Sequence, residues 1–164
     1  MTLTFREARL GDIPAMFELR GRTRENPISA GELAVLDITP ESTMTSIASG
    51  RTCSWVCLHG ASLVGFATGN HPSGEILVVA VSPDFEGRGI GKKLLHSVME
   101  SLQSRGCARL WLAASPDPGV RSYGFYRHLG WRPTGQTDAH GDEILERTPN
   151  HRLERPVTPN SDVP

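Results

Sequence analysis

The sequence predicts a single mixed α/β domain. Apolar and polar residues alternate from residue 52 to 68, which is typical of an antiparallel strand pair. Apolar residues recur at helical spacing between Leu94 and Leu102. This predicted helix separates two short apolar segments, 75–82 and 109–114, and strands joined by a long helix are usually parallel neighbours. We therefore expect both antiparallel and parallel strand pairs.

The first half of the chain is expected to begin with a strand and a helix. Segment 3–9 alternates in polarity, and Asp12 is a typical N-cap for the apolar helix pattern that follows it. Thr39, followed by proline, is typical of the next helix start, and Gly50 of its end. Between these helices, residues 21–38 combine proline, glycine and several charges, which indicates a loop or a broken helix.

The second half is expected to supply most of the sheet. The elements expected there are, in chain order, strands 53–58, 62–68 and 75–82, a helix closing at Gly106, strand 109–114, a helix from Asp117 to Gly130, and strands 131–137 and 143–148. Strand 75–82 is nearly all apolar and rich in β-branched residues, so we expect it to be buried on both faces.

The composition excludes several classes of protein. The 164 residues are 38% hydrophobic and 21% charged, with a net charge of −1. The longest apolar run, Ile76–Val81, is far below the roughly 20 residues of a membrane helix, and the N-terminal residues contain no apolar signal core. We therefore expect a cytoplasmic protein without a membrane partner. The near-neutral charge also argues against a nucleic-acid partner.

The folded domain is expected to span residues 1–148. Residues 149–164 are polar and contain four prolines, which predicts a loosely packed C-terminal tail. The three cysteines lack metal-ligand spacing, so we expect no metal site and assign Cys53 and Cys57 to the core. A homodimer formed through an exposed sheet edge or through the tail is an open alternative to a monomer.

The most informative segment is a glycine-rich turn between strand 75–82 and the next helix. Such a turn points unpaired backbone N–H groups and the positive end of the helix dipole at one spot, which makes an anion site. Gly87, Gly89 and Gly91 let an anion approach the backbone closely. Their spacing matches neither the dinucleotide fingerprint G-x-G-x-x-G nor the P-loop pattern G-x-x-x-x-G-K-S/T. A glycine-rich turn without a ligand is the alternative interpretation.

These residues resemble the signature of the GNAT superfamily of acetyl-CoA-dependent N-acetyltransferases. The signature Q/R-x-x-G-x-G/A reads EGRGIG at 86–91, with Glu86 in place of Gln or Arg, after the strand end VSP at 81–83. A second landmark, Y-x-x-x-G-F/W, is matched by YRHLGW at 126–131. The resemblance spans residues 3–148. It implies a mostly antiparallel central sheet with a splayed parallel strand pair and helices on both faces.

The resemblance also implies a binding site for acetyl-CoA as co-substrate. The diphosphate of coenzyme A would lie on the backbone N–H groups of Arg88, Gly89, Ile90, Gly91 and Lys92. The backbone of Val79 and Val81 would hydrogen-bond the pantetheine arm between the splayed strands. We expect the Lys92 side chain, in the first helical turn, to add a cation beside the bound phosphate.

Acetyl transfer to an amine needs a group that accepts the amine proton and a donor for the departing thiolate. The resemblance places Tyr126 near the sulfur as the acid; the alternative is a core aromatic on its helix. Glu75 is the candidate base, acting through a water, because a two-residue period puts it on the face of Leu77. His71 is the other candidate base, since the pKa of imidazole suits the task.

The predicted function is transfer of the acetyl group from acetyl-CoA to a primary amine of a small molecule or a protein. Residues 20–29 are the candidate acceptor pocket, and the sequence does not name the acceptor. A non-catalytic acyl-CoA-binding regulatory module on the same fold is the alternative. A toxin-type acetyltransferase acting on aminoacyl-tRNA would need a basic face, which the net charge does not suggest.

Overall fold

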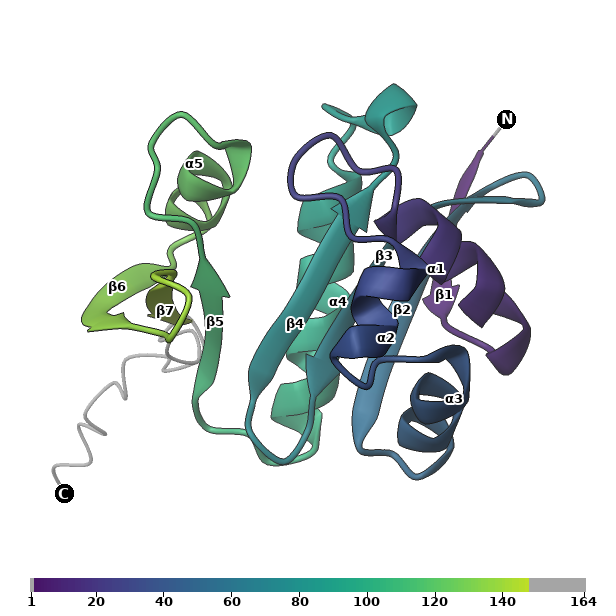
Figure 1. The fold of residues 1–164 in the computed structure, drawn as a ribbon, viewed down its shortest axis with the longest axis horizontal. Coiled ribbons are helices and arrows are strands. Elements are labelled where there is room, and N and C mark those ends of the chain that lie inside the picture. The colour runs from purple at the N-terminus through teal and green to yellow at the C-terminus, as the bar shows by residue number, and fades with distance from the viewer. Residues whose placement is uncertain (1, 148–164) are drawn as a thin grey trace, which may run out of the picture.

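The computed structural model describes residues 2–147, which form a seven-stranded sheet flanked by helices (Figure 1). The elements are β1 (Leu3–Glu7), α1 (Ile13–Arg20), α2 (Ala30–Val35), α3 (Pro40–Ala48), β2 (Thr52–His59), β3 (Ser62–Asn70), β4 (Glu75–Val81), α4 (Ile90–Ser104), β5 (Leu110–Ala114), α5 (Arg121–His128), β6 (Arg132–Thr137) and β7 (Glu143–Arg147). The strand order is β1-β2-β3-β4-β5-β7-β6, and only β4 and β5 are parallel. The expected fold class is confirmed. The predicted tail 149–164 lies outside the described residues.

Two apolar cores lie on opposite faces of the sheet. Helix α4 packs against β2, β3 and β4 on one face, and α1 and α3 cover the other. Gly69 allows α4 to approach β3 closely: a Cβ there would lie 2.7 Å from Val98 Cγ1 and 2.8 Å from Leu102 Cδ1. The helix that follows the glycine-rich turn is therefore firmly seated on the sheet.

Strand β4 contains a β-bulge. Its register with β3 passes from Val78 directly to Ile76, so Leu77 is an extra residue and the alternation of side chains shifts by one. Glu75 consequently lies on the face of Val78 and Ala80, which α1 covers. Leu77 has no partner on β3 in this register, so the predicted common face of Glu75 and Leu77 stays a prediction. Leu77 is 47% exposed, so the expectation of a strand buried on both faces is wrong.

The parallel strands β4 and β5 pair at one position only within the described chain, Glu75 opposite Trp111. The backbone N–H of Trp111 donates to Gly74 O at 3.2 Å, and its indole N–H donates to Ser73 O at 2.9 Å. Beyond this point the two strands separate toward α5, as Figure 1 shows, while β5 pairs along its whole length with β7. This is the splayed pair that the family resemblance implies.

The structure corrects the expected role of one aspartate and the start of one helix. Asp12 directly precedes α1 as expected, but it makes no side-chain capping bond to that helix. Its carboxylate instead accepts two hydrogen bonds from the Arg6 guanidinium, at 2.7 and 3.0 Å. Helix α5 begins at Arg121 rather than at Asp117, because Asp117 Oδ1 accepts the Gly119 N–H at 2.8 Å and closes a separate turn.

Candidate active site

The glycine-rich turn between β4 and α4 presents free backbone donors to solvent. Gly89 adopts φ +76° directly before α4, and a Cβ built there would meet nothing within 4 Å. The first bond into the helix runs from Lys93 N–H to Gly89 O at 3.1 Å, so the N–H groups of Ile90, Gly91 and Lys92 have no partner inside the helix. The Ile90 side chain is buried and anchors this end of the helix. The turn therefore has the geometry of an anion site.

The edge of β4 that faces β5 carries unpaired backbone groups. Ser82 N–H donates to Val64 O on β3 at 2.8 Å, so the backbone groups of Val81 and Val79, which alternate with it, point toward β5. The β4–β5 register does not extend to these two residues. An exposed strand edge of this kind accepts an extended ligand through main-chain hydrogen bonds. The amide groups of a pantetheine arm fit it.

Two lysines occupy the first turn of α4 and differ in direction. Lys93 Nζ lies 4.1 Å from the centre of the Phe5 ring, so it is engaged with β1. Both lysines line a surface hollow of about 400 Å³ that begins at Gly89 and continues past His96. The proposed phosphate contact of the Lys92 side chain stays a prediction. The Arg88 guanidinium stacks on the Phe85 ring at 4.6 Å. The contact predicted between Arg88 and the diphosphate therefore involves its backbone N–H and not its side chain.

Tyr126 lies on α5, and α5 touches the start of α4. The neighbouring Phe125 ring reaches to 3.4 Å from where a Cβ on Gly91 would stand. Burial raises the pKa of Tyr126 to about 12, while the positive charge of Arg20 lowers it. Within residues 2–147 the Tyr126 hydroxyl makes no hydrogen bond, and its ring packs edge-on to Trp131 with centroids 6.1 Å apart. The phenol is therefore protonated at neutral pH and is a hydrogen-bond donor.

The high pKa of Tyr126 limits what this donor can do. A thiol has an ordinary pKa near 8.5, about 3.5 units below that of the Tyr126 phenol. Full transfer of the proton to a thiolate is therefore unfavourable, because the phenol is the weaker acid. Hydrogen bonding to the sulfur does not carry this cost. Full transfer requires that the phenolate be stabilised, and Arg20 is the positive charge that acts on it.

Within residues 2–147, no hydrogen bond or ion pair joins Glu75 to Tyr126. Glu75 lies where β4 pairs with β5, and α5 follows the other end of β5, about 10 Å away along that strand. Burial raises the pKa of Glu75, and the negative charge of Asp138 in the β6–β7 turn raises it further. Glu75 is therefore a carboxyl group whose pKa is raised toward neutral pH, and it lies at the end of β4 that still pairs with β5.

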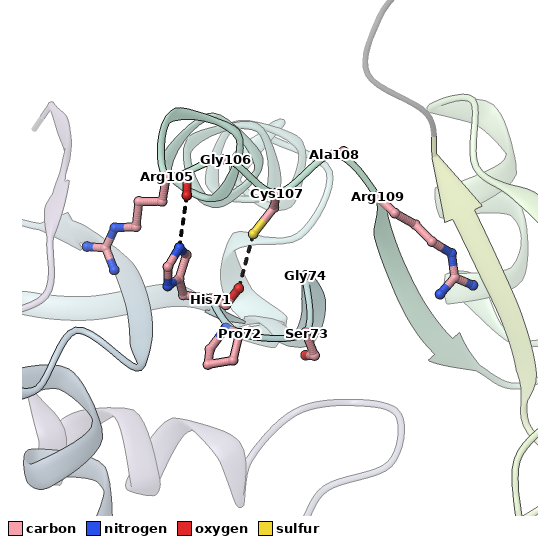
Figure 2. A pocket seen from close by; sticks show the side chains of 9 residues that line it. All are labelled: His71, Pro72, Ser73, Gly74, Arg105, Gly106, Cys107, Ala108 and Arg109. Carbon is pink, nitrogen blue, oxygen red and sulfur yellow. Dashed lines mark hydrogen bonds between the residues drawn. The ribbon is translucent and has the colours of Figure 1, made fainter.

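His71 lies in another part of the molecule. It lines a hollow of about 390 Å³ between the β3–β4 turn and the α4–β5 loop, together with Arg105 and Cys107 (Figure 2). Its Nε2 lies 3.1 Å from Arg105 O, and the Cys107 thiol donates to His71 O at 3.1 Å. This hollow is at the opposite end of β4 from the glycine-rich turn. His71 therefore faces this hollow, and its role as the other candidate base stays a prediction.

Sequence reasoning missed an ionic cluster beside the turn. The Glu86 carboxylate accepts hydrogen bonds from Arg24, in the loop between α1 and α2, at 3.0 Å and from Arg121 at the start of α5. Glu25 accepts the backbone N–H of Arg121 at 2.9 and 3.1 Å. The one signal available in the sequence was Glu86 itself, which departs from the Gln or Arg of the signature.

The described part of the chain offers no cluster of three His, Cys, Asp or Glu side chains for a metal ion. Among residues 2–147, no helix has both the length and the apolar character needed to cross a membrane. The turn and the free edge of β4 together offer the backbone donors and acceptors that a phosphorylated, extended ligand needs.

Comparison with known proteins shows which family this chain is similar to. The model of the acetyltransferase (GNAT) family matches residues 14–131. Glucosamine 6-phosphate N-acetyltransferase of Trypanosoma brucei brucei is 30% identical over 126 residues, covering 74% of this chain and 83% of that protein. The [ribosomal protein bS18]-alanine N-acetyltransferase of Escherichia coli K12 is 26% identical and covers 84% and 91%.

Two further similarities differ in extent. An uncharacterized N-acetyltransferase, ycf52-like, of Prochlorococcus marinus is 43% identical over 72 residues, which span 42% of this chain but 38% of that relative. The crystal structure of the PaiA N-acetyltransferase from Thermoplasma acidophilum in complex with coenzyme A has a TM-score of 0.76 at 18% identity, covering 91% of this chain and all of that one. The chain belongs to the acetyltransferase (GNAT) family and is an acyltransferase.

Proposed function

We propose that this protein transfers the acetyl group of acetyl-CoA to a primary amine of a small molecule or a protein. The observation that carries the proposal is the free edge of β4, which leads directly into the glycine-rich turn. A phosphorylated ligand with an extended amide-bearing arm fits both parts at once. Few other metabolites combine a diphosphate with such an arm.

The proposed roles follow the chain from the turn inward. The backbone N–H groups from Arg88 to Lys92 hold the diphosphate, and Val79 and Val81 hydrogen-bond the pantetheine arm. When bound, acetyl-CoA supplies an acetyl thioester that an amine can attack. Tyr126 donates a hydrogen bond to the sulfur as it becomes a thiolate, and Glu75 accepts the amine proton through a water.

The amine acceptor is supported by two relatives. Their names specify a sugar amine, glucosamine 6-phosphate, in one case and the alanine of a ribosomal protein in the other. The carboxylate of Glu75, where β4 and β5 pair, and that of Asp138, in the turn between β6 and β7, suit a cationic amine. Residues 20–29, which hydrogen-bond to α5 and to the turn, are proposed to line the acceptor side.

Two measurements test the proposal. Millimolar acetyl-CoA should raise the melting temperature, because a ligand that binds only the native state stabilises it. A thiol-release screen should then identify an acceptor among amino acids, polyamines, amino sugars, aminoglycosides and peptide N-termini. Absence of any thermal shift would refute the coenzyme site. A shift without thiol release for any amine would instead favour a non-catalytic acyl-CoA-binding module.

A further inference from the structure

Glu86 gathers two arginines from distant segments onto one carboxylate oxygen. Arg24 Nε and Arg121 Nη1 both donate to Glu86 Oε2. Arg24 belongs to the loop between α1 and α2, and Arg121 opens α5. The two segments and the turn meet at the same end of the sheet, as Figure 1 shows. Glu86 thus joins three elements that surround the proposed coenzyme site.

The two guanidinium groups keep most of their hydrogen-bonding capacity. Each carries five N–H donors, and within residues 2–147 each places one nitrogen on Glu86 and makes no other side-chain hydrogen bond. The side chains of Arg24 and Arg121 are 60% and 56% exposed, whereas that of Glu86 is only 18% exposed. The carboxylate is thus covered while the arginines face solvent. A carboxylate placed this way orients guanidinium groups for a second anion.

The neighbouring contacts fix the loop that carries Arg24. Glu25 accepts the first backbone N–H of α5, where the preceding Val120 has no side chain to cap the helix. Arg20 Nη1 donates to Asn26 O at 2.6 Å, and this holds Asn26 at φ +51°, a conformation that asparagine tolerates better than most residues. The loop is therefore held at both ends, and Arg24 is not a freely moving surface side chain.

We propose that Arg24 and Arg121, oriented by Glu86, bind the diphosphate of the coenzyme that lies on the glycine-rich turn. This inference rests on the proposed function. Guanidinium groups are well suited to phosphate because their N–H donors match its oxygens pairwise. Glu86 is then a positioning residue, and the departure from Gln or Arg at the first signature position is compensated by two arginines supplied from elsewhere in the chain.

The direction in which Glu86→Gln changes coenzyme affinity distinguishes this proposal from a purely electrostatic effect of the Glu86 charge. A lone carboxylate beside a bound diphosphate repels it, so Glu86→Gln would tighten coenzyme binding if Glu86 acted only through its charge. If Glu86 orients the two arginines, the same substitution releases them and weakens binding. We expect about a fivefold higher Kd for coenzyme A, and about tenfold for Arg24→Gln or Arg121→Gln, since a charged hydrogen bond in an exposed site is the interaction lost.

Three ligands locate the contact. Thermal-shift titrations of the full chain with coenzyme A, dephospho-coenzyme A and pantetheine compare a ligand with all its phosphates, one with the diphosphate alone and one with neither. Both arginine variants should lose affinity equally for the first two ligands and bind pantetheine as the wild type does. A loss that disappears with dephospho-coenzyme A, or an equal loss with pantetheine, would overturn the assignment.

Arg22→Gln is the matched control. Arg22 lies in the same loop, and among residues 2–147 its side chain forms an ion pair only with Glu18, one helical turn away, at 3.8 Å. Its coenzyme affinity should equal that of the wild type, and ligand-free melting temperatures show whether each variant is folded. If the wild type binds no coenzyme A, the proposed function fails. If the wild type binds and the Arg24, Arg121 and Glu86 variants bind equally well, only the present inference fails.

Discussion

Substitution of Gly89 by alanine separates folding from coenzyme binding at the same residue. Gly89 has φ +76°, which costs a residue with a Cβ about 1–2 kcal/mol. Because nothing lies within 4 Å of the added methyl group, no steric cost is added to this strain. For a chain of this size, about 2–4 °C is lost per kcal/mol, so Gly89→Ala should lower the melting temperature by about 2–8 °C.

The effect on the ligand should be larger. At 100 times its Kd, coenzyme A stabilises the wild type by about 2.7 kcal/mol, a thermal shift of about 5–11 °C. The methyl group would occupy the open space through which the diphosphate reaches the backbone. A hundredfold loss of affinity would reduce the stabilisation at the same concentration to about 0.4 kcal/mol, a shift of about 1–2 °C. Differential scanning fluorimetry with and without coenzyme A measures both effects.

Gly69→Ala provides the opposite control. Its Cβ would collide with Val98 and Leu102 at 2.7 and 2.8 Å, so it should destabilise the fold by about 1–3 kcal/mol. Gly69 pairs with Ile76 at the far end of β4 from the turn, and the coenzyme-induced shift should persist. The reasoning is refuted if Gly89→Ala lowers the melting temperature as calculated but keeps the full coenzyme-induced shift.

Three further predictions follow from the same geometry. Tyr126→Phe should lower turnover about tenfold or more and leave the Kd of coenzyme A unchanged, because only the donor to the sulfur is lost. Thiol-release assays measure the turnover, and titrations measure the Kd. Unchanged turnover would remove Tyr126 from the acid role. Burial raises the pKa of Glu75 and so penalises its charged form. Glu75→Gln should therefore raise the melting temperature at neutral pH, and this gain should vanish below about pH 4. Turnover should fall in the same variant, and turnover equal to that of the wild type would exclude Glu75 as the base. The Arg6 guanidinium lowers the pKa of Asp12, so this stabilisation is present above the ordinary aspartate pKa and is lost as pH falls through the lowered value. Asp12→Asn should therefore cost about 1–2 kcal/mol in urea unfolding at pH 7 and progressively less as the pH falls, and a pH-independent cost would contradict the ion-pair explanation.

Much of the fold could be predicted because its signals are local. The Thr39 N-cap, whose hydroxyl accepts the Ser42 N–H at 3.1 Å, and the helical period of α4 act within a few residues of the chain. The glycine-rich turn is also a local pattern, which is why the fold class and the family could be predicted from it. The proposed roles of its N–H groups and of Val79, Val81 and Tyr126 stay predictions that the experiments above test.

The features that could not be predicted depend on partners distant in sequence. The bulge at Leu77 is defined by the register with β3, and nothing in the β-branched pattern of β4 marks it. The bonds of Glu86 to Arg24 and Arg121 join residues 62 and 35 positions apart, beyond the reach of any periodicity. Asp117 was expected to cap a helix because an aspartate before proline suits both a cap and a turn, and the structure selects the turn.

The separation of Glu75 from Tyr126 constrains how an amine can be activated. An alkylamine with a pKa near 10 arrives as an ammonium ion, and the carboxylates of Glu75 and Asp138 would attract it. The same attraction stabilises the charged amine and so opposes loss of its proton. Recruitment and activation therefore compete as long as both carboxyl groups are ionised. Uptake of the amine proton by Glu75 relieves this competition, and its raised pKa suits Glu75 to take that proton and release it to solvent.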